Sequence, residues 1–353
     1  MRPLRKNFTS NFSYPDNYFS ELSSYIKKYP LDQLAALDYL RFLGVLSLDK
    51  NYDEFYDYII SNKESFDDIY MRALRERVRY LIFKKKNIVD SQLIIKELMS
   101  LDKNQPIWIY YFNNSVNGYF EEVYNNVFYT AIPKNASTTL KNHIIKNVKK
   151  SSGKINPHSV FGNPYFSANL DVLKKAKSGA GLRLGVIRDP VARFASYITK
   201  NVLEEDSLNL EILGKKLAKP HFTFMYGLPT QPNIEEAIDN YLDYCYLYND
   251  FLHHTLPQEA YFGSIFDYDM ICDVPNIERL IEYVKPYLGD VTAPAPSREM
   301  SSSSIPNYTL GTKCKIKKQF SDDYAFLKKV ASYNNSIVSG SFVNNFSLLD
   351  SHA

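Results

Sequence analysis

The sequence predicts an α/β fold in which a parallel sheet is flanked by helices, with an α-helical extension at the N-terminus. From about residue 125 onward, apolar strand patterns alternate with amphipathic helix patterns. Two of the strands, at residues 127–132 and 182–187, each lead through a short polar loop into a helix. Because strands that alternate with helices pair in parallel, we expect both loops at one edge of the sheet, where ligands bind.

The N-terminal part has a different pattern. Residues 1–30 are polar and aromatic and predict an irregular arm, whereas residues 31–100 predict four short helices. The clearest apolar stripe has helical spacing and consists of Tyr52, Phe55, Tyr56, Ile59 and Ile60. We therefore expect an N-terminal arm and helical region over residues 1–115 and a second domain over residues 116–353. The helices could dock a partner or acceptor, but packing on the second domain is slightly favoured.

The remaining elements are predicted from apolar runs and their boundaries. Strands are expected at residues 105–111, 127–132, 182–187 and 259–265, and helices at residues 138–149, 191–203, 233–252 and 275–288. Asn233 and Glu236 have the spacing of a capping box, which predicts the start of the third of these helices. Gly289 is a typical residue to end the fourth.

The loop after the first of the two strands has the composition of an anion site. It contains Pro133, Lys134, Asn135, Ala136, Ser137, Thr138 and Thr139. Backbone N–H groups at a helix N-terminus point toward one spot, and the helix dipole adds partial positive charge there. Lys134 supplies a full charge, and the hydroxyl groups supply further donors. The loop lacks glycine and does not match the triphosphate pattern G-x-x-x-x-G-K-[ST], but a phosphate-like ligand is expected.

A second segment follows the strand at residues 182–187. Arg188, Asp189 and Pro190 form a turn, and Ser196 lies about two helical turns further on. A structural ion pair between Arg188 and Asp189 is the alternative interpretation of the arginine.

Together these two segments resemble the PAPS-dependent sulfotransferases, in particular the carbohydrate-type branch. The family patterns are P-K-x-x-[ST]-[ST] and R-[DN]-P-x-x-R-x-x-S, and the likeness covers roughly residues 125–335. It implies a P-loop-like sulfotransferase fold, 3′-phosphoadenosine 5′-phosphosulfate (PAPS) as sulfuryl donor, and a glycan or polysaccharide acceptor. The glycine-rich late motif of the aryl and steroid enzymes is absent, which disfavours small phenolic acceptors.

The resemblance also implies roles for individual residues. The first loop would hold the 5′-phosphosulfate, and Arg188 and Ser196 would hold the 3′-phosphate. The Pro/Ser-rich segment at residues 291–306 is either a lid over the nucleotide, with Arg298 and Ser301–Ser304 as its contacts, or a disordered linker.

Sulfuryl transfer also needs a residue that stabilises the leaving phosphate and a base for the acceptor hydroxyl. Lys134 is the expected stabilising residue. His158 lies between the two motifs, in the interval that holds the catalytic histidine of glycosaminoglycan-type relatives, and is the expected base. His253 and His254 belong to a segment that resembles the family's H-x-x-P-Q stretch on the acceptor side, and His254 is the alternative. A structural role for any one of these histidines has nearly equal weight.

Composition excludes several other classes. A net charge of +3 is too small to indicate nucleic-acid binding. The three cysteines, at positions 245, 272 and 314, are too few and too far apart for a disulfide framework or a metal site, and no metal is expected.

Location is predicted from three further observations. The basic N-terminus has no apolar core typical of a signal peptide, and no stretch is long and apolar enough for a membrane helix, whereas Golgi members of the family carry an anchor. Residues 135–137 form a glycosylation sequon inside the expected phosphate loop, where a glycan would block the site. A cytoplasmic, bacterial-type protein is therefore expected.

Two other functions stay open at this stage. The first is a nucleotide kinase on the same sheet architecture, which is disfavoured because the glycine-rich loop and a Mg²⁺-binding acidic strand end are not evident. The second is a non-catalytic binding protein on a sulfotransferase scaffold, against which the intact Lys134, Arg188 and Ser196 argue.

Overall fold

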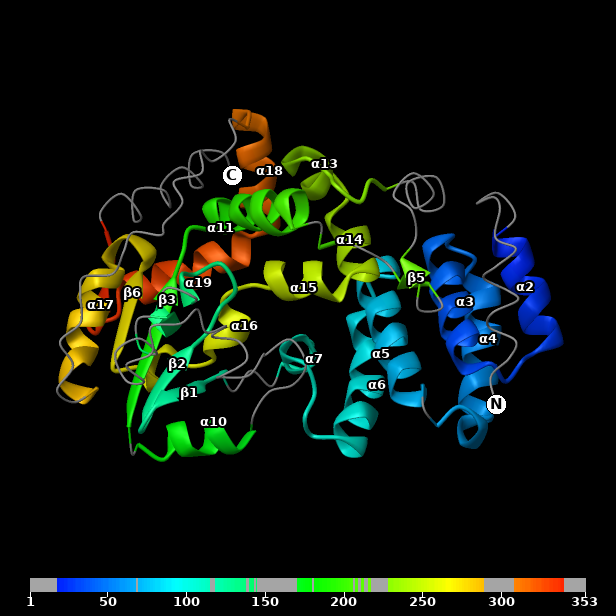
Figure 1. Ribbon diagram of the computed structural model, residues 1–353, viewed down its shortest axis with the longest axis horizontal. Coiled ribbons are helices and arrows are strands. Elements are labelled where there is room, and N and C mark those ends of the chain that lie inside the picture. Colours follow the sequence, from blue (N-terminus) through cyan, green and yellow to red (C-terminus); the bar gives the residue numbers. More distant parts are fainter. Residues whose placement is uncertain are drawn as a thin grey trace. The chain divides into compact units, whose positions relative to one another are not determined.

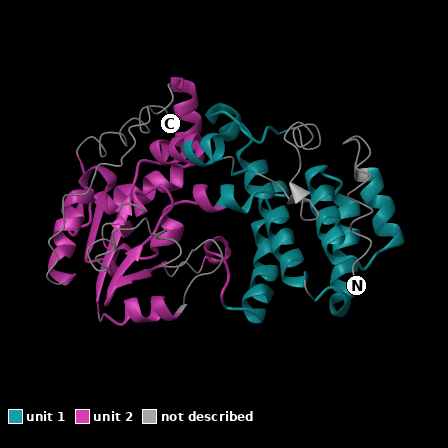
Figure 2. Ribbon diagram, in the orientation of Figure 1, with its two compact units in different colours: residues 1–103, 200–252 teal, residues 104–199, 253–353 magenta. Residues whose placement is uncertain are grey.

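The computed structural model of this 353-residue chain divides into two compact units, which Figure 2 colours separately. It describes residues 18–67, 69–114, 118–137, 140–142, 144, 170–179, 181–205, 207–208, 211–212, 215–216, 228–288 and 308–339. The first unit holds residues 1–103 and 200–252, and the second holds residues 104–199 and 253–353. The boundary expected between residues 115 and 116 stays a prediction about domain organisation.

The first unit is mainly helical. Its elements are α2 (Tyr18–Lys28), α3 (Gln33–Val45), α4 (Asp49–Ser61), η2 (Lys63–Ser65), α5 (Tyr70–Arg79), η3 (Tyr80–Lys84), α6 (Ile88–Leu101), β4 (Glu211–Ile212), β5 (Lys215–Lys216), α13 (Ile234–Asp239) and α14 (Tyr241–Leu247). The four helices predicted between residues 31 and 100 are confirmed as α3 to α6. Buried tyrosines form much of the core, and the rings of Tyr52 and Tyr80 stack with centroids 3.7 Å apart.

The second unit contains the sheet (Figure 1). Its elements are α7 (Ile107–Phe112), β1 (Glu121–Tyr124), β2 (Val127–Thr130), α10 (Leu170–Lys177), β3 (Leu182–Ile187), α11 (Pro190–Tyr197), α16 (Glu259–Phe262), η5 (Ile265–Asp267), β6 (Met270–Asp273), η6 (Val274–Asn276), α17 (Ile277–Val284), η7 (Lys285–Tyr287), α18 (Leu310–Gln319), α19 (Ser321–Ala331) and β7 (Ser336–Ile337). Two elements, η4 (Ile198–Glu204) and α15 (Asn249–Thr255), span the boundaries between the units.

Five strands form this sheet in the order β1-β2-β3-β6-β7. β1 pairs with β2 in antiparallel fashion, and the other three pairs are parallel. The central strand β3 is buried along most of its length, as expected for a parallel strand covered on both faces. The predicted fold class, a mostly parallel sheet flanked by helices, is confirmed.

Helices cover the sheet closely. A Cβ atom added at Gly185 in β3 would lie 2.5 Å from the ring of Phe262 in α16, so glycine is the residue that permits this approach. The Phe262 ring also packs against Phe326 of α19, with centroids 5.3 Å apart. In the same unit α17 packs against β6, and α10 against β1.

Three sequence-based element predictions are wrong. Residues 105–111 were expected to form a strand, but α7 begins directly after Pro106, and a short aromatic run does not distinguish strand from buried helix. A strand was also expected at residues 259–265, but Glu259–Phe262 form the helix α16, which ends where Gly263 takes a φ of 64°. The single helix expected over residues 233–252 is divided into α13, α14 and α15, although its predicted capping box is confirmed.

Candidate functional site

The two polar segments singled out in the sequence lie at the same edge of the sheet. β2 and β3 are parallel neighbours in register, with Thr130 opposite Gly185. The segment that follows β2 and the segment that follows β3 therefore begin side by side at the carboxyl edge, as predicted.

The first segment has the backbone geometry of an anion-binding loop. A turn closes where the Asn135 N–H donates to the Ile132 carbonyl oxygen at 3.2 Å. Lys134 and Ala136 both have positive φ, 67° and 58°, and Asn135 between them does not. Such alternation turns successive N–H groups toward one concave side, which is the geometry called a nest.

A helix starts immediately after this loop. Ser137, residues 140–142 and Ile144 are helical, and the Leu140 N–H donates to the Ala136 carbonyl oxygen at 3.1 Å. The amides at the start of a helix lack intrahelical acceptors, so those of Ala136 and Ser137 belong to the positive end of the helix. Thr138 and Thr139 lie outside the described residues.

Asn135 holds the loop against β3. Its side chain is fully buried, and Nδ2 donates to the Val186 carbonyl oxygen at 2.9 Å. The sequence predicted Asn135 as a nucleotide-binding residue. The geometry leaves only its backbone for that role, because its side chain is used inside the protein.

A buried ion pair anchors the helix that follows the loop. Lys141 Nζ contacts the Glu121 carboxylate of β1, and each side chain is 1% exposed. The Tyr119 hydroxyl donates to Glu121 Oε1 at 3.0 Å. Burial raises the pKa of Glu121, and Lys141 opposes that rise.

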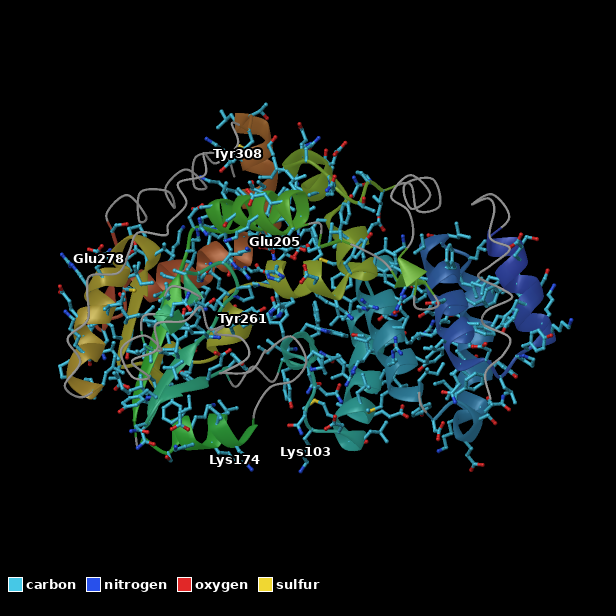
Figure 3. The ribbon with its side chains drawn as sticks, viewed as in Figure 1. Lys103, Lys174, Glu205, Tyr261, Glu278 and Tyr308 are labelled. Carbon is cyan, nitrogen blue, oxygen red and sulfur yellow. The ribbon has the colours of Figure 1, made fainter. Side chains whose placement is uncertain are left out.

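The second segment begins with Arg188 at the end of β3. Its Nη1 donates to the Lys134 carbonyl oxygen at 2.8 Å, so a hydrogen bond joins the two segments. Burial lowers the pKa of Arg188, an effect opposed by neighbouring Asp189 and by Tyr308, which Figure 3 labels beside α18. A guanidinium group nevertheless stays charged at neutral pH.

Asp189 is not the ion-pair partner that the alternative interpretation of Arg188 required. Its Oδ1 accepts from the Ala192 N–H at 2.9 Å and so caps α11, and Pro190 occupies the first turn. Its Oδ2 accepts from the Tyr324 hydroxyl of α19 at 3.1 Å. The carboxylate therefore positions α11, on which Ser196 is half-buried.

Arg193 makes a second link between the segments. This side chain is 2% exposed, and its Nε donates to the Pro133 carbonyl oxygen at 3.2 Å. Its Nη1 donates to the Leu256 carbonyl oxygen at 2.8 Å and lies 3.9 Å from Asp323 Oδ2. Burial raises the pKa of Asp323 to about 6, with Arg193 opposing the shift. The position of Arg193 within the motif is thus explained by its role in holding the loops.

Of the three candidate histidines, His253 and His254 lie within the described residues. His254 is half-buried, and its ring stacks on Tyr197 of α11 with centroids 4.7 Å apart and planes 13° apart. His253 is buried, with Nδ1 3.2 Å from the hydroxyl of Tyr261, which Figure 3 labels on α16. His254 therefore lies beside the helix that carries Ser196. His158 and Arg298 lie outside the described residues.

Two kinds of feature are absent from the described residues. They contain no group of three or more His, Cys, Asp or Glu side chains placed to hold a metal ion. Within the same residues, no helix is both long enough and apolar enough to cross a membrane.

Sequence reasoning missed the residues that join the two segments. The sequence predicts Gln258 only as the last residue of the H-x-x-P-Q stretch, and it predicts no role for Asp323. The structure places the Gln258 side chain between the two segments, with Asp323 behind it. The role of Gln258 has no local sequence signature, because its partners Arg188 and Asp323 are 70 and 65 residues away in the sequence.

Comparison with protein families gave one match. A family model described as "Sulfotransferase family" matches residues 117–336, the region that contains both loop segments and the five-stranded sheet apart from the last residue of β7. Comparisons with curated proteins and with solved structures found no match.

Proposed function

The chain belongs to the sulfotransferase family, and from that premise we propose that it transfers the sulfuryl group of PAPS to a hydroxyl group of a glycan. The observation that carries this proposal is the hydrogen bond from Arg188 to the Lys134 carbonyl oxygen, which joins the two loop segments. A cationic side chain at each segment, Lys134 and Arg188, suits a ligand with two separate anionic groups. PAPS has such groups at its 5′ and 3′ positions.

The residues present fit the donor. The nest at Lys134–Ala136 and the first amides of the helix would bind the 5′-phosphosulfate. Arg188 and Ser196 would bind the 3′-phosphate by one charged and one neutral hydrogen-bond donor. Thr138, Thr139 and Arg298 are further proposed contacts.

The chemistry divides between two groups on the protein. The acceptor oxygen forms a bond to sulfur as the bond between sulfur and the phosphate oxygen breaks, and the electron pair leaves with the phosphate. Lys134 would stabilise the negative charge that grows on this phosphate. The acceptor proton would pass to a base, for which we propose His158 and, as the alternative, His254, which is described and half-buried.

The class of acceptor rests on the family branch. The two motifs resemble those of the carbohydrate-type sulfotransferases, and the glycine-rich late motif of enzymes that act on small phenols is absent from the sequence. A glycan hydroxyl is therefore the proposed acceptor.

The environment of Asn135 supports a location without N-glycosylation, such as the cytoplasm. Asn135 is the acceptor position of the sequon at residues 135–137, and its Nδ2 is buried and bonded to Val186. A glycan on that nitrogen would remove the bond and could not fit inside the protein.

The proposal is tested by a transfer assay with labelled PAPS and a panel of polysaccharides and small phenols. Labelled polysaccharide at wild-type Lys134, and none with Lys134→Ala, would support it. Label on a phenol alone would overturn the acceptor class. No turnover despite binding of 3′-phosphoadenosine 5′-phosphate (PAP), the donor without its sulfuryl group, would favour a non-catalytic binding protein.

A further inference from the structure

Gln258 connects the two loop segments through one side chain. It lies just before α16, and its side chain is 0% exposed. The amide oxygen Oε1 accepts from Asn135 Nδ2 at 2.6 Å and from the Arg188 backbone N–H at 2.9 Å. The amide nitrogen Nε2 donates to the Arg188 carbonyl oxygen at 2.8 Å. The Gln258 amide therefore forms hydrogen bonds with the first loop and with both backbone polar groups of Arg188.

Gln258 is itself fixed from behind by α19. Its backbone N–H donates to Asp323 Oδ1 at 2.6 Å, and Nε2 lies 3.4 Å from Asp323 Oδ2. Asp323 also faces Arg193, whose Nε bonds the Pro133 carbonyl oxygen. These contacts form a buried, closed network around the base of both segments.

An amide is the side chain that this place requires. It accepts two hydrogen bonds and donates two, to the Arg188 carbonyl oxygen and to Asp323, which an aliphatic group cannot do. A carboxylate could accept but not donate to the Arg188 carbonyl oxygen, and its charge would lie beside Asp323. Loss of the amide would remove one hydrogen-bond partner each from the Arg188 N–H, the Arg188 carbonyl and the Asn135 amide.

We infer that Gln258 is a positioning residue that sets the spacing between the 5′-phosphosulfate loop and the 3′-phosphate segment, and thereby sets the preference for nucleotides phosphorylated at both positions. This inference rests on the proposed function. A nucleotide with one anionic end needs only one segment in place, whereas a nucleotide with two needs both in register. Loss of the Gln258 contacts should therefore weaken binding of nucleotides with two anionic groups more than binding of nucleotides with one.

The experiment compares two nucleotides on three proteins. PAP and adenosine 5′-phosphosulfate, which lacks the 3′-phosphate, are titrated into wild type, Gln258→Leu and Gln105→Leu. Gln105 is the other buried glutamine among the described residues, so Gln105→Leu controls for loss of a buried amide. We expect Gln258→Leu to lose about ten-fold more affinity for PAP than for adenosine 5′-phosphosulfate. We expect Gln105→Leu to keep the wild-type ratio. A wild-type ratio in Gln258→Leu would overturn the inference.

A second measurement separates this inference from the proposed function. Hydrogen exchange without nucleotide should be about ten-fold faster at residues 131–137 and 188–193 in Gln258→Leu than in Gln105→Leu. If the wild-type protein bound no PAP, the proposed function would fail. If hydrogen exchange in both segments were unchanged in Gln258→Leu, Gln258 would not link them and the inference would fail. If Gln258→Leu did not fold, Gln258→Asn, whose amide is one methylene shorter, should shift the ratio in the same direction, and an unshifted ratio would contradict the inference.

Discussion

Arg188 Nη1 donates a hydrogen bond to the backbone carbonyl oxygen of Lys134 at 2.8 Å. The two residues are 54 positions apart in the sequence, yet each follows a strand of the same parallel pair. Their contact places one cationic side chain at each of two adjoining loops. This arrangement supports the proposal of a site that takes two anionic groups of one nucleotide.

The first prediction concerns the 3′-phosphate. Arg188→Ala should weaken PAP binding by about 1.5–3 kcal/mol, and Ser196→Ala by about 1 kcal/mol, because hydrogen bonds to charged groups are the stronger ones. Calorimetric titration gives both values. Arg183→Ala is the matched control, since Arg183 lies at the opposite end of β3 and pairs with Asp269 at 3.2 Å. Equal losses for adenosine 5′-phosphosulfate and PAP would contradict the assignment of Arg188.

The second prediction concerns the backbone of the first loop. Lys134 has a φ of 67°, which is unfavourable for a residue with a Cβ atom. Lys134→Gly should therefore have a free energy of unfolding about 1 kcal/mol higher than Lys134→Ala, while both lose PAP affinity. Urea denaturation measures the difference. Ala136→Gly, at a φ of 58°, should be stabilised similarly without any change of charge, and equal stability of the two Lys134 variants would count against the strain.

The third prediction separates the two catalytic roles. Lys134→Ala should lower PAP affinity and turnover together, because Lys134 meets negative charge in both the ground state and the transition state. His158→Ala should leave PAP affinity nearly intact and reduce turnover about 10²-fold or more, which is the usual effect of losing a general base. Single-turnover rates and PAP titrations measure both quantities.

The histidine assignment has its own controls. His352→Ala, near the end of the sequence, should change neither quantity. If His158→Ala kept full turnover and His254→Ala lost it, the base would be the histidine that stacks on Tyr197.

The fourth prediction concerns pH. Burial raises the pKa of Asp323 to about 6, so the folded chain holds this proton at pH values where the unfolded chain has lost it. The stabilisation from this group is full below about pH 4 and is lost as the pH rises to about 6, a change of about 3 kcal/mol. Asp323→Asn lacks this dependence. The free energy of unfolding of wild type minus that of Asp323→Asn should therefore fall between pH 4 and 6, and a constant or rising difference would refute the assignment.

Two of the five strands in the sheet, β2 and β3, were predictable from local pattern, whereas β1, β6 and β7 were not predicted. The strand expected at residues 182–187 is β3, and the one expected at 127–132 contains β2, because buried parallel strands are nearly continuous apolar runs. The segments 105–111 and 259–265 have similar composition, but most of each is helical, in α7 and α16. In these short segments, Pro106 at the start of α7 and Gly263 at the end of α16 indicate a helix more strongly than the aromatic residues indicate a strand.

The candidate site was predictable only where its residues are consecutive. The loop at residues 133–137 and the turn at Arg188 were predictable as loop segments because in each case a strand, a loop and a helix follow one another. The roles of Gln258 and Asp323 could not be predicted, since they depend on contacts between segments 65 or more residues apart. Likewise, the burial of the Asn135 side chain against Val186 depends on how β3 packs beside the loop.

The most direct test of the two-anion site is a calorimetric titration of wild type with PAP, with adenosine 5′-phosphosulfate and with ATP–Mg²⁺, each at low and high salt. The bonded loops predict that PAP binds tightest and that its affinity falls as salt increases, because both contacts are charge-assisted. Binding of ATP–Mg²⁺ without binding of PAP would contradict the account and favour a nucleotide kinase.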